Sequence, residues 1–309
     1  MTVVAPDRPG LRAELCVLAS GSGGNCSVLA VEQGGTRRVC LIDLGLSPRR
    51  TELLLAERGL GLHDVDDAIL THLDDDHFHR GWVRALPRHA TLRVHARHAA
   101  LDDCFGLFGR LPCQFEAGFV LRCGAGVRAL LAAHDRAGVS ALRVDFAGPP
   151  ACALGFATDL GRVTDPLVGL LAGVDVLAIE SNYCPKMQEE SGRPWFLRRR
   201  ITGGAGHLSN LEALEAILRI GPGEHVVLLH LSRQCNCPEL VASLHEGADY
   251  AVTITSQTHP TRWVRIGQRH EVLREPVRDA DRVPEESHAA PAEGELVGSG
   301  VPVLRSPDA

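Results

Sequence analysis

The most informative stretch of this sequence is Thr71-His72-Leu73-Asp74-Asp75-Asp76-His77. Four of its side chains are potential metal ligands: His72, Asp74, Asp76 and His77. The segment before it, Val65 to Leu70, ends in an apolar run that predicts a buried strand. A ligand cluster at a strand end is held on rigid backbone yet opens to solvent, as a catalytic metal requires. The alternative, from this stretch alone, is a solvated acidic turn with two chance histidines.

Further along the chain, other expected strands also stop on a residue that can bind metal. The five strand-end residues of this kind are Asp43, His72, His134, Asp159 and His230. A single histidine at a strand end is usually a structural residue, but five such endings beside the Asp74–His77 cluster are hard to attribute to chance. Together they predict two adjacent metal sites that share one bridging carboxylate.

Composition excludes several classes of protein. The chain has 309 residues and a net charge of −6, so no general basic face attracts nucleic acid or anionic membrane. Apolar runs fall short of the roughly 18 residues of a membrane span, and residues 1–10 lack the apolar region of a signal peptide. The ten cysteines are scattered, which indicates reduced, buried residues of a cytoplasmic protein. The close pair Cys235 and Cys237 has no second pair beside it, which disfavours a cysteine metal site.

The N-terminal part of the chain predicts an antiparallel meander. Its three strands cover residues 12–19, 26–31 and 38–42, and glycine-rich turns join them. The turn at residues 20–25 leads into a strand rather than a helix, which argues against a phosphate-binding loop or a dinucleotide fingerprint.

The rest of the core is expected to mix strands and helices. Further strands are predicted at 65–70, 92–95, 127–133, 140–146, 152–158, 174–179, 226–229, 252–255 and 263–266. Helices are predicted at 48–58, 78–86, 164–171 and 238–245, and Ser209 with Glu212 forms a capping box that begins another. Residues 184–206 are interpreted as irregular and basic. We expect a single domain over residues 1–275 and a disordered tail over 276–309, which is rich in Pro, Glu, Ala and Gly.

This order of ligands resembles the metallo-β-lactamase superfamily. The family signature, His-x-His-x-Asp-His after a strand and then His, Asp and His at later strand ends, is matched by seven positions with one departure. These positions are His72, Asp74, Asp76, His77, His134, Asp159 and His230. The resemblance implies a four-layer αββα sandwich of two mixed β-sheets. It also implies that one metal is held by His72, residue 74 and His134, that the other is held by Asp76, His77 and His230, and that Asp159 bridges them.

A narrower resemblance is to the YycJ (WalJ) branch, which is similar to bacterial metal-dependent DNA exonucleases and, more distantly, to RNase Z and RNase J. It is carried by the segments 20–26, 42–47, 158–161, 206–210 and 230–232. The superfamily resemblance implies that Asp43 supports the ligand cluster from behind, and the resemblance to RNase Z implies that His207 assists the leaving group. The alternative for His207 is a histidine packed beside a helix cap.

Asp74 stands where the family has histidine. A carboxylate is shorter and harder than imidazole, so it should favour Mn²⁺ or Fe²⁺ over Zn²⁺ at that site. Two alternatives stay open: the first site fills weakly, or Asp75 takes over as the ligand. We therefore expect one or two divalent metal ions as cofactor.

The function expected from this resemblance is hydrolysis, in which bound metal acidifies a water that attacks phosphorus or a carbonyl carbon. Asp76 is expected to orient the attacking group as well as bind metal. Candidate substrate contacts are Arg198, Arg199, Arg200, Ser209 and Asn210, although such an arginine run can be only a solvated face. The first hypothesis is a phosphodiesterase or nuclease acting on nucleic acid. The second is a hydrolase of a small ester, lactone or thioester, and the third is a non-catalytic binding or regulatory protein with a decayed site.

Overall fold

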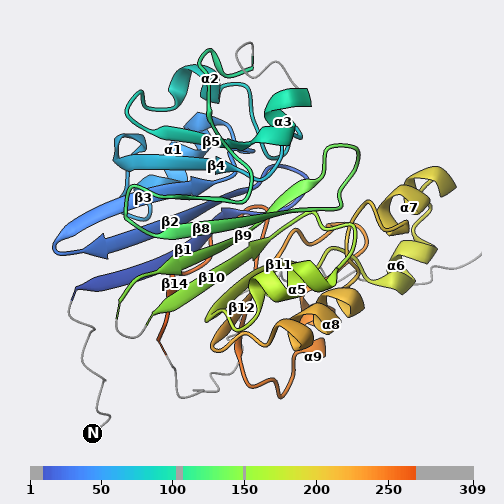
Figure 1. The fold of residues 1–309 in the computed structure, drawn as a ribbon. Coiled ribbons are helices and arrows are strands. Elements are labelled where there is room, and N and C mark those ends of the chain that lie inside the picture. Colours follow the sequence, from blue (N-terminus) through green and yellow to red (C-terminus); the bar gives the residue numbers. More distant parts are fainter. Residues whose placement is uncertain (1–9, 102–106, 149–150, 269–309) are drawn as a thin grey trace, which may run out of the picture. The chain divides into compact units, whose positions relative to one another are not determined.

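A computed structural model describes residues 10–101, 107–148 and 151–268 of the chain. Its strands form two seven-stranded mixed sheets that face one another (Figure 1). This arrangement confirms the predicted pair of mixed sheets. The predicted tail at 276–309 lies outside the described residues, and the single domain over 1–275 stays a prediction.

The first sheet has the strand order β14-β1-β2-β3-β4-β5-β6. Its strands are β1 (Leu11–Ala19), β2 (Cys26–Gln33), β3 (Thr36–Ile42), β4 (Val65–Leu70), β5 (Thr91–His95), β6 (Cys113–Phe115) and β14 (Val264–Ile266). The strands β1, β2 and β3 pair antiparallel, as the meander prediction requires. The pairing from β3 through β4 to β5 is parallel, so these strands end at the same edge.

The second sheet has the order β13-β12-β11-β10-β9-β8-β7. Its strands are β7 (Gly118–Val120), β8 (Gly126–Ala132), β9 (Val139–Phe146), β10 (Cys152–Ala157), β11 (Val176–Glu180), β12 (His225–Leu229) and β13 (Ala251–Ile254). The strands β10, β11, β12 and β13 are parallel to one another. The predicted hairpin partners β8 and β9 pair antiparallel.

Alternation along the strands divides the apolar side chains among three cores, one between the two sheets and one on the outer face of each sheet. On β1, Leu15 and Val17 face the core between the sheets, whereas Cys16 and Leu18 face the outer core of the first sheet. This period of two follows from the pleat of a strand, whose successive side chains point to opposite faces. Both faces of each sheet are therefore buried, which explains why the central strands read as continuous apolar runs.

Helices cover the outer faces of the two sheets (Figure 1). The helices are α1 (Pro48–Ala56), α2 (Trp82–Ala85), α3 (Ala96–Leu101), α5 (Asp165–Leu171), α6 (Pro185–Glu190), α7 (Trp195–Thr202), α8 (Asn210–Ile220) and α9 (Pro238–Leu244), with a 3-10 turn at Leu62–Asp64. Leu55 of α1 and Trp82 of α2 pack on the first sheet, and Ile217 of α8 and Val241 of α9 pack on the second. The four αββα layers are thus present.

Two predictions of local structure were wrong. Residues 184–206 are not irregular, because they contain α6 and α7, whose apolar residues Met187, Leu197 and Ile201 pack around Tyr183 and Cys235. The predicted helix at 78–86 is reduced to the four residues of α2. The short strands β6 and β7, which lie at sheet edges, were not predicted, since three residues carry too little periodicity to be recognised.

The structure also shows the state of the cysteines and the length of the helices. Among the described residues all cysteines are free thiols, and Cys16, Cys40 and Cys152 are buried in core strands. In the same residues, no helix has both the length and the apolar character that crossing a membrane would need.

Candidate metal centre and active site

The candidate ligands gather where strands of both sheets end. Asp43 and His230 directly follow the ends of β3 and β12, while His72, His134 and Asp159 lie two residues beyond the ends of β4, β8 and β10. Parallel strands in one sheet end at a common edge, and here the edges of the two sheets meet. Ligands that are up to 158 positions apart in the sequence, from His72 to His230, are therefore brought to one place.

Backbone strain is concentrated at the same strand ends. Within the described residues, the non-glycine residues with positive φ are Asp43 (62°), Asp135 (38°), Asp159 (53°) and His230 (56°). Each such conformation costs on the order of 1–3 kcal/mol and persists only when its surroundings require it. Three of these four residues, Asp43, Asp159 and His230, belong to the strand-end cluster, and strained positions of this kind are typical of a functional site.

The first group of ligands consists of His72, His134 and Asp159, whose ligand atoms lie within 4.8 Å of one another. Asp74 Oδ2 lies 3.9 Å from His72 Nε2 and 4.0 Å from His134 Nε2. His134 Nδ1 donates to the carbonyl oxygen of Gly206 at 2.9 Å, which leaves Nε2 as the ring nitrogen that can bind metal. Three residues of this group and Asp74 thus surround one small volume.

The second group contains Asp76, His77 and His230 around the other side of Asp159. His77 Nε2 lies 3.0 Å from Asp159 Oδ2 and 3.8 Å from Asp76 Oδ2. His230 Nε2 lies 3.6 Å from Asp76 Oδ2, and its Nδ1 lies 2.9 Å from Asp159 Oδ1. Asp159 therefore contacts His77 and His230 and lies within 4.8 Å of the ligand atoms of the first group, which is the position that a bridging ligand needs.

Asp43 lies behind the second group. Its Oδ2 accepts a hydrogen bond from His77 Nδ1 at 2.8 Å, and its Oδ1 accepts from the backbone N–H and hydroxyl of Thr71 at 2.8 and 2.9 Å. Asp43 is buried, so this carboxylate fixes both the ring of His77 and the start of the ligand loop. Carboxylate–histidine pairs of this kind orient a metal-binding imidazole and raise its basicity.

The charges of the second group stabilise one another strongly. Burial alone would lower the pKa of His77, but the negative charges of Asp159 and Asp43 raise it well above its ordinary value. Burial would raise the pKa of Asp159, but His230 and His77 hold it well below its ordinary value. Burial would likewise lower the pKa of His230, but the charge of Asp159 and the hydrogen bond to it raise this pKa well above its ordinary value. Without a metal ion, protons on these histidines therefore neutralise the buried carboxylate.

Glu180 is a site residue that the sequence prediction missed. It is the last residue of β11, its side chain is fully buried, and its Oε1 lies 2.7 Å from Nδ1 of His207. Its Oε2 accepts hydrogen bonds from the backbone N–H groups of Leu160 and Leu208 at 2.8 and 3.1 Å. The sequence contained a signal for Glu180, because this acidic residue ends β11 much as Asp159 follows the end of the neighbouring strand β10.

His207 is oriented by this contact. Burial would lower the pKa of His207, but the charge of Glu180 and the hydrogen bond to it raise the pKa above its ordinary value. The imidazole stays partly exposed, and it lies beside Asp159 and His230. A protonated His207 can therefore donate a proton to a group bound at the centre.

A cavity of about 360 Å³ opens over both ligand groups. Its lining includes Asp74, Asp76, His134, Asp159, His207 and His230. Arg193 and Arg200 also line it, so positive side chains border a floor that is rich in carboxylates. The volume falls in the range of roughly 300–1,000 Å³ that is usual for ligand pockets.

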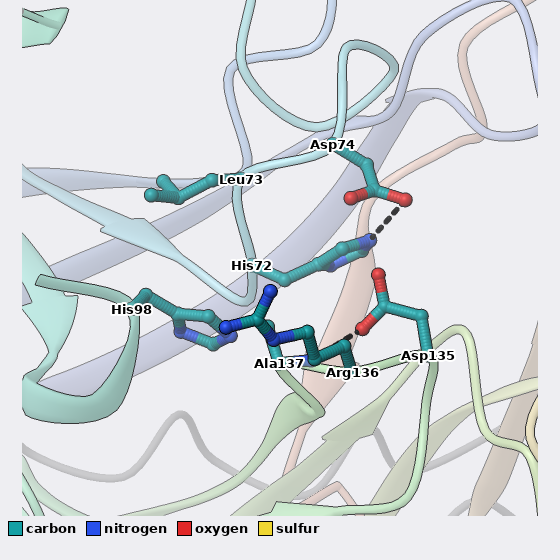
Figure 2. Close-up of a pocket in the computed structure, with 7 residues that line it drawn as sticks. All are labelled: His72, Leu73, Asp74, His98, Asp135, Arg136 and Ala137. Atoms are coloured by element: carbon teal, nitrogen blue, oxygen red, sulfur yellow. Dashed lines mark hydrogen bonds and ion pairs between the residues drawn. The ribbon is translucent and has the colours of Figure 1, made fainter. Parts of the chain in front are cut away.

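A second cavity, of about 260 Å³, is also lined by Asp74 (Figure 2). There, Asp74 and Asp135 flank the outer end of the His72 ring, whose Nε2 is buried without a hydrogen-bond partner. Burial and then the negative charge of Asp135 raise the pKa of Asp74. Asp75, the alternative ligand to Asp74, is exposed.

The predicted substrate contacts differ in their surroundings. Arg200 lines the cavity over the ligand groups, whereas Arg198 Nη1 donates to the carbonyl oxygen of Glu189 at 2.8 Å. Ser209 is buried and bonded to Glu212, as the capping box predicted. Asn210 is buried, and its amide group is hydrogen-bonded to Ser181 and Asn236. These internal bonds argue against contacts between substrate and either Ser209 or Asn210.

Comparison with known proteins agrees with this geometry. The metallo-beta-lactamase superfamily profile matches residues 20–111. Among solved structures, the metallo-beta-lactamase fold protein YhfI from Bacillus subtilis superposes with a TM-score of 0.58 at 16% identity, covering 81% of this chain and 99% of that chain. The fold and the ligand arrangement define a member of the metallo-β-lactamase superfamily.

Two sequence relatives place the chain more narrowly. The exodeoxyribonuclease YycJ of Bacillus anthracis is 30% identical over 256 residues, which cover 79% of this chain and 94% of that protein. The exodeoxyribonuclease WalJ of Streptococcus pneumoniae serotype 2 is 28% identical over 267 residues, which cover 81% of this chain and 97% of that protein. The chain belongs to the YycJ/WalJ family.

Proposed function

We propose that this protein is a metal-dependent phosphodiesterase that hydrolyses DNA. The observation that carries the proposal is the closeness of Asp159 to His72 and His134 on one side and to His77 and His230 on the other, at the floor of a cavity that Arg200 borders. The YycJ and WalJ relatives, which are named exodeoxyribonucleases, support DNA as the substrate. The fold alone would leave the chemistry open, because one fold hosts many activities.

The side chains at the centre fit divalent metal ions. His72 Nε2 is buried without a hydrogen-bond partner, which is costly unless its lone pair binds a metal ion or accepts a hydrogen bond from water. The residues His72, His134, Asp74 and Asp159 would hold one ion, and Asp76, His77, His230 and Asp159 the other. When bound, such ions acidify water and neutralise charge that develops on phosphate oxygens.

Two residues of this chain would move the protons. Asp76 lies at the cavity floor, and its pKa is lowered because a hydrogen bond with His230 and the charge of His77 outweigh burial. As a carboxylate, Asp76 accepts a proton from the attacking water as the new oxygen–phosphorus bond forms. His207, held by Glu180, donates its proton to the leaving oxygen as the old phosphorus–oxygen bond breaks.

The donor set supports a preference for hard metal ions. Asp74 adds a carboxylate where the superfamily signature has imidazole, and Asp135 places a further negative charge close to it. Oxygen ligands suit Mn²⁺ or Fe²⁺, and imidazole suits Zn²⁺. We therefore propose that Mn²⁺ or Fe²⁺ supports activity better than Zn²⁺. We also propose that the protein acts in the cytoplasm.

A substrate panel tests the proposal against its two alternatives. The purified protein is assayed with single- and double-stranded DNA and bis-p-nitrophenyl phosphate, and with lactones and thioesters, across Mn²⁺, Zn²⁺ and Mg²⁺. We expect metal-dependent release of nucleotides, and a preference for lactones or thioesters would overturn the phosphodiesterase. Elemental analysis of the native protein tests the decayed site, since a non-catalytic protein should purify without stoichiometric metal.

A further inference from the structure

Helix α7 carries two neighbouring aromatic side chains on its exposed surface. Trp195 is 66% exposed and Phe196 is 63% exposed, and the other large exposed hydrophobic side chains among the described residues are aliphatic. Exposed aromatic side chains lose the favourable burial of a large apolar surface. Such a pair therefore requires an explanation that the fold does not supply.

The opposite face of α7 is anchored. Ile201 and Leu197 pack with Tyr183, Met187 and Cys235, which ties the helix to the segment that follows β12. The backbone N–H of Cys184 donates to the carbonyl oxygen of Cys235 at 2.7 Å, and Arg193 Nη2 donates to Gln234 Oε1 at 2.8 Å. Trp195 and Phe196 are therefore presented outward by a helix that is packed from behind.

The helix that carries the aromatic pair also borders the proposed active site. In Figure 1, α6 and α7 stand out from the two sheets. Leu197, Arg200 and Ile201 of α7 line the cavity that contains the candidate ligands. Phe196 precedes Arg200 by four residues and Trp195 precedes Arg199 by four, so each aromatic ring shares a helix face with an arginine. The members of each pair are about 6 Å apart along the helix axis.

We propose that Trp195 and Phe196 form a stacking platform for the unpaired bases of single-stranded DNA, beside arginines that contact its phosphates. The inference rests on the proposed nuclease function and adds the form of DNA that is bound. Single-strand binding surfaces combine positive charge along the backbone with aromatic rings on which successive bases stack. Paired bases are stacked within a duplex, so the platform selects single-stranded ends.

Binding of two oligonucleotides to the metal-loaded protein tests this proposal. One is an oligothymidylate and the other is an abasic strand of equal length and charge, both with phosphorothioate linkages that slow cleavage. The wild type should bind the strand with bases about 5- to 150-fold more tightly for each stacked base. The double variant Trp195→Ala/Phe196→Ala should bind both strands almost equally, because only the bases distinguish them.

Intrinsic fluorescence gives a second readout. Of the three tryptophans, Trp82 is buried and Trp263 is partly buried, so Trp195 is the most exposed. Oligothymidylate should quench the wild-type emission, and Trp195→Phe should keep the binding preference while losing most of the quenching. The matched control is Leu218→Ala on α8, which removes a side chain that is 69% exposed and should leave the preference unchanged.

The outcomes separate the platform from the nuclease. A preference for bases that survives in the double variant would overturn the platform even if DNA is cleaved. If the variant changes only self-association, measured by light scattering, the aromatic pair is a protein contact and the proposal fails. A preference that the double variant abolishes, in a wild-type protein that hydrolyses no unmodified DNA strand, would support the platform and reject the nuclease.

Discussion

Asp43 Oδ2 lies 2.8 Å from Nδ1 of His77, while the Nε2 of the same ring lies 3.0 Å from the carboxylate of Asp159. One buried aspartate thus sets both the tautomer and the direction of a candidate ligand. We predict that Asp43→Asn lowers metal affinity or activity by roughly 10- to 100-fold, because the amide is a weaker acceptor and carries no charge.

Titration calorimetry with Mn²⁺ and elemental analysis measure the effect of Asp43→Asn. The matched control is Asp145→Asn, which removes a half-exposed carboxylate paired with Arg143 and Arg128 on β9 and β8. Metal content and rate that stay at the wild-type level in Asp43→Asn would count against its supporting role.

Glu180 should determine the pH range over which His207 can donate a proton. The raised pKa keeps His207 protonated to higher pH, and activity that depends on the proton is lost as pH rises through that pKa. Glu180→Gln removes the negative charge and lowers this pKa, so the descending limb of the rate profile should move to lower pH. The profile is measured at saturating metal. A descending limb that does not move would show that His207 is not the proton donor.

Residue 74 should influence the choice of metal. Asp74→His removes one negative charge beside His72 and His134, and it replaces an oxygen donor by nitrogen. We expect the wild type to be more active with Mn²⁺ or Fe²⁺ than with Zn²⁺, and the variant to shift toward Zn²⁺. If Asp74 is too short to reach a metal, the wild type should carry about one ion and the variant about two. A variant with the same preference, stoichiometry and pH profile would make Asp74 a bystander.

The three arginines of α7 should contribute unequally to DNA binding. Neutralising all three should flatten the salt dependence of DNA binding by up to about three units if each contacts a phosphate. Because Arg198 is bonded to the backbone of Glu189 and Arg200 lines the cavity, Arg200→Ala should reduce the slope by close to one unit and Arg198→Ala by less. The slope is measured from binding constants across salt concentrations, and equal effects of both variants would contradict this ranking.

Metal should stabilise the fold more at alkaline pH. In the metal-free protein the raised pKa values of His77 and His230 stabilise the fold below their unfolded value of about 6.5, and this is lost as pH rises through the folded values. Asp159, whose pKa is lowered, contributes above about pH 3.9, and its contribution is lost only as pH falls. Because metal must displace protons, the rise in Tm on adding Mn²⁺ should grow from about pH 6 to about pH 8.5. Thermal unfolding with and without a chelator measures it, and a Tm increase independent of pH would contradict the assignment.

Much of the fold could be predicted because its signals are local. The glycine turns that separate the first three strands and the capping box of Ser209 with Glu212 act over a few residues, and they lie where they were predicted. The helices α6 and α7 were missed because their apolar residues are few. They are stabilised by contacts with Tyr183 and Cys235, and the latter is distant in the sequence.

The sequence by itself determined which residue types end the strands, and hence that metal ligands such as His72, Asp159 and His230 were available. Only the tertiary structure decided their partners: Asp43 with His77, Glu180 with His207, and Asp135 beside Asp74. It also exposed Trp195 and Phe196 on the helix that borders the cavity, and it enclosed Asn210 among other side chains. The physical reason is that strand and turn propensities depend on neighbouring residues, whereas these contacts form only when two sheets pack and their strand ends meet.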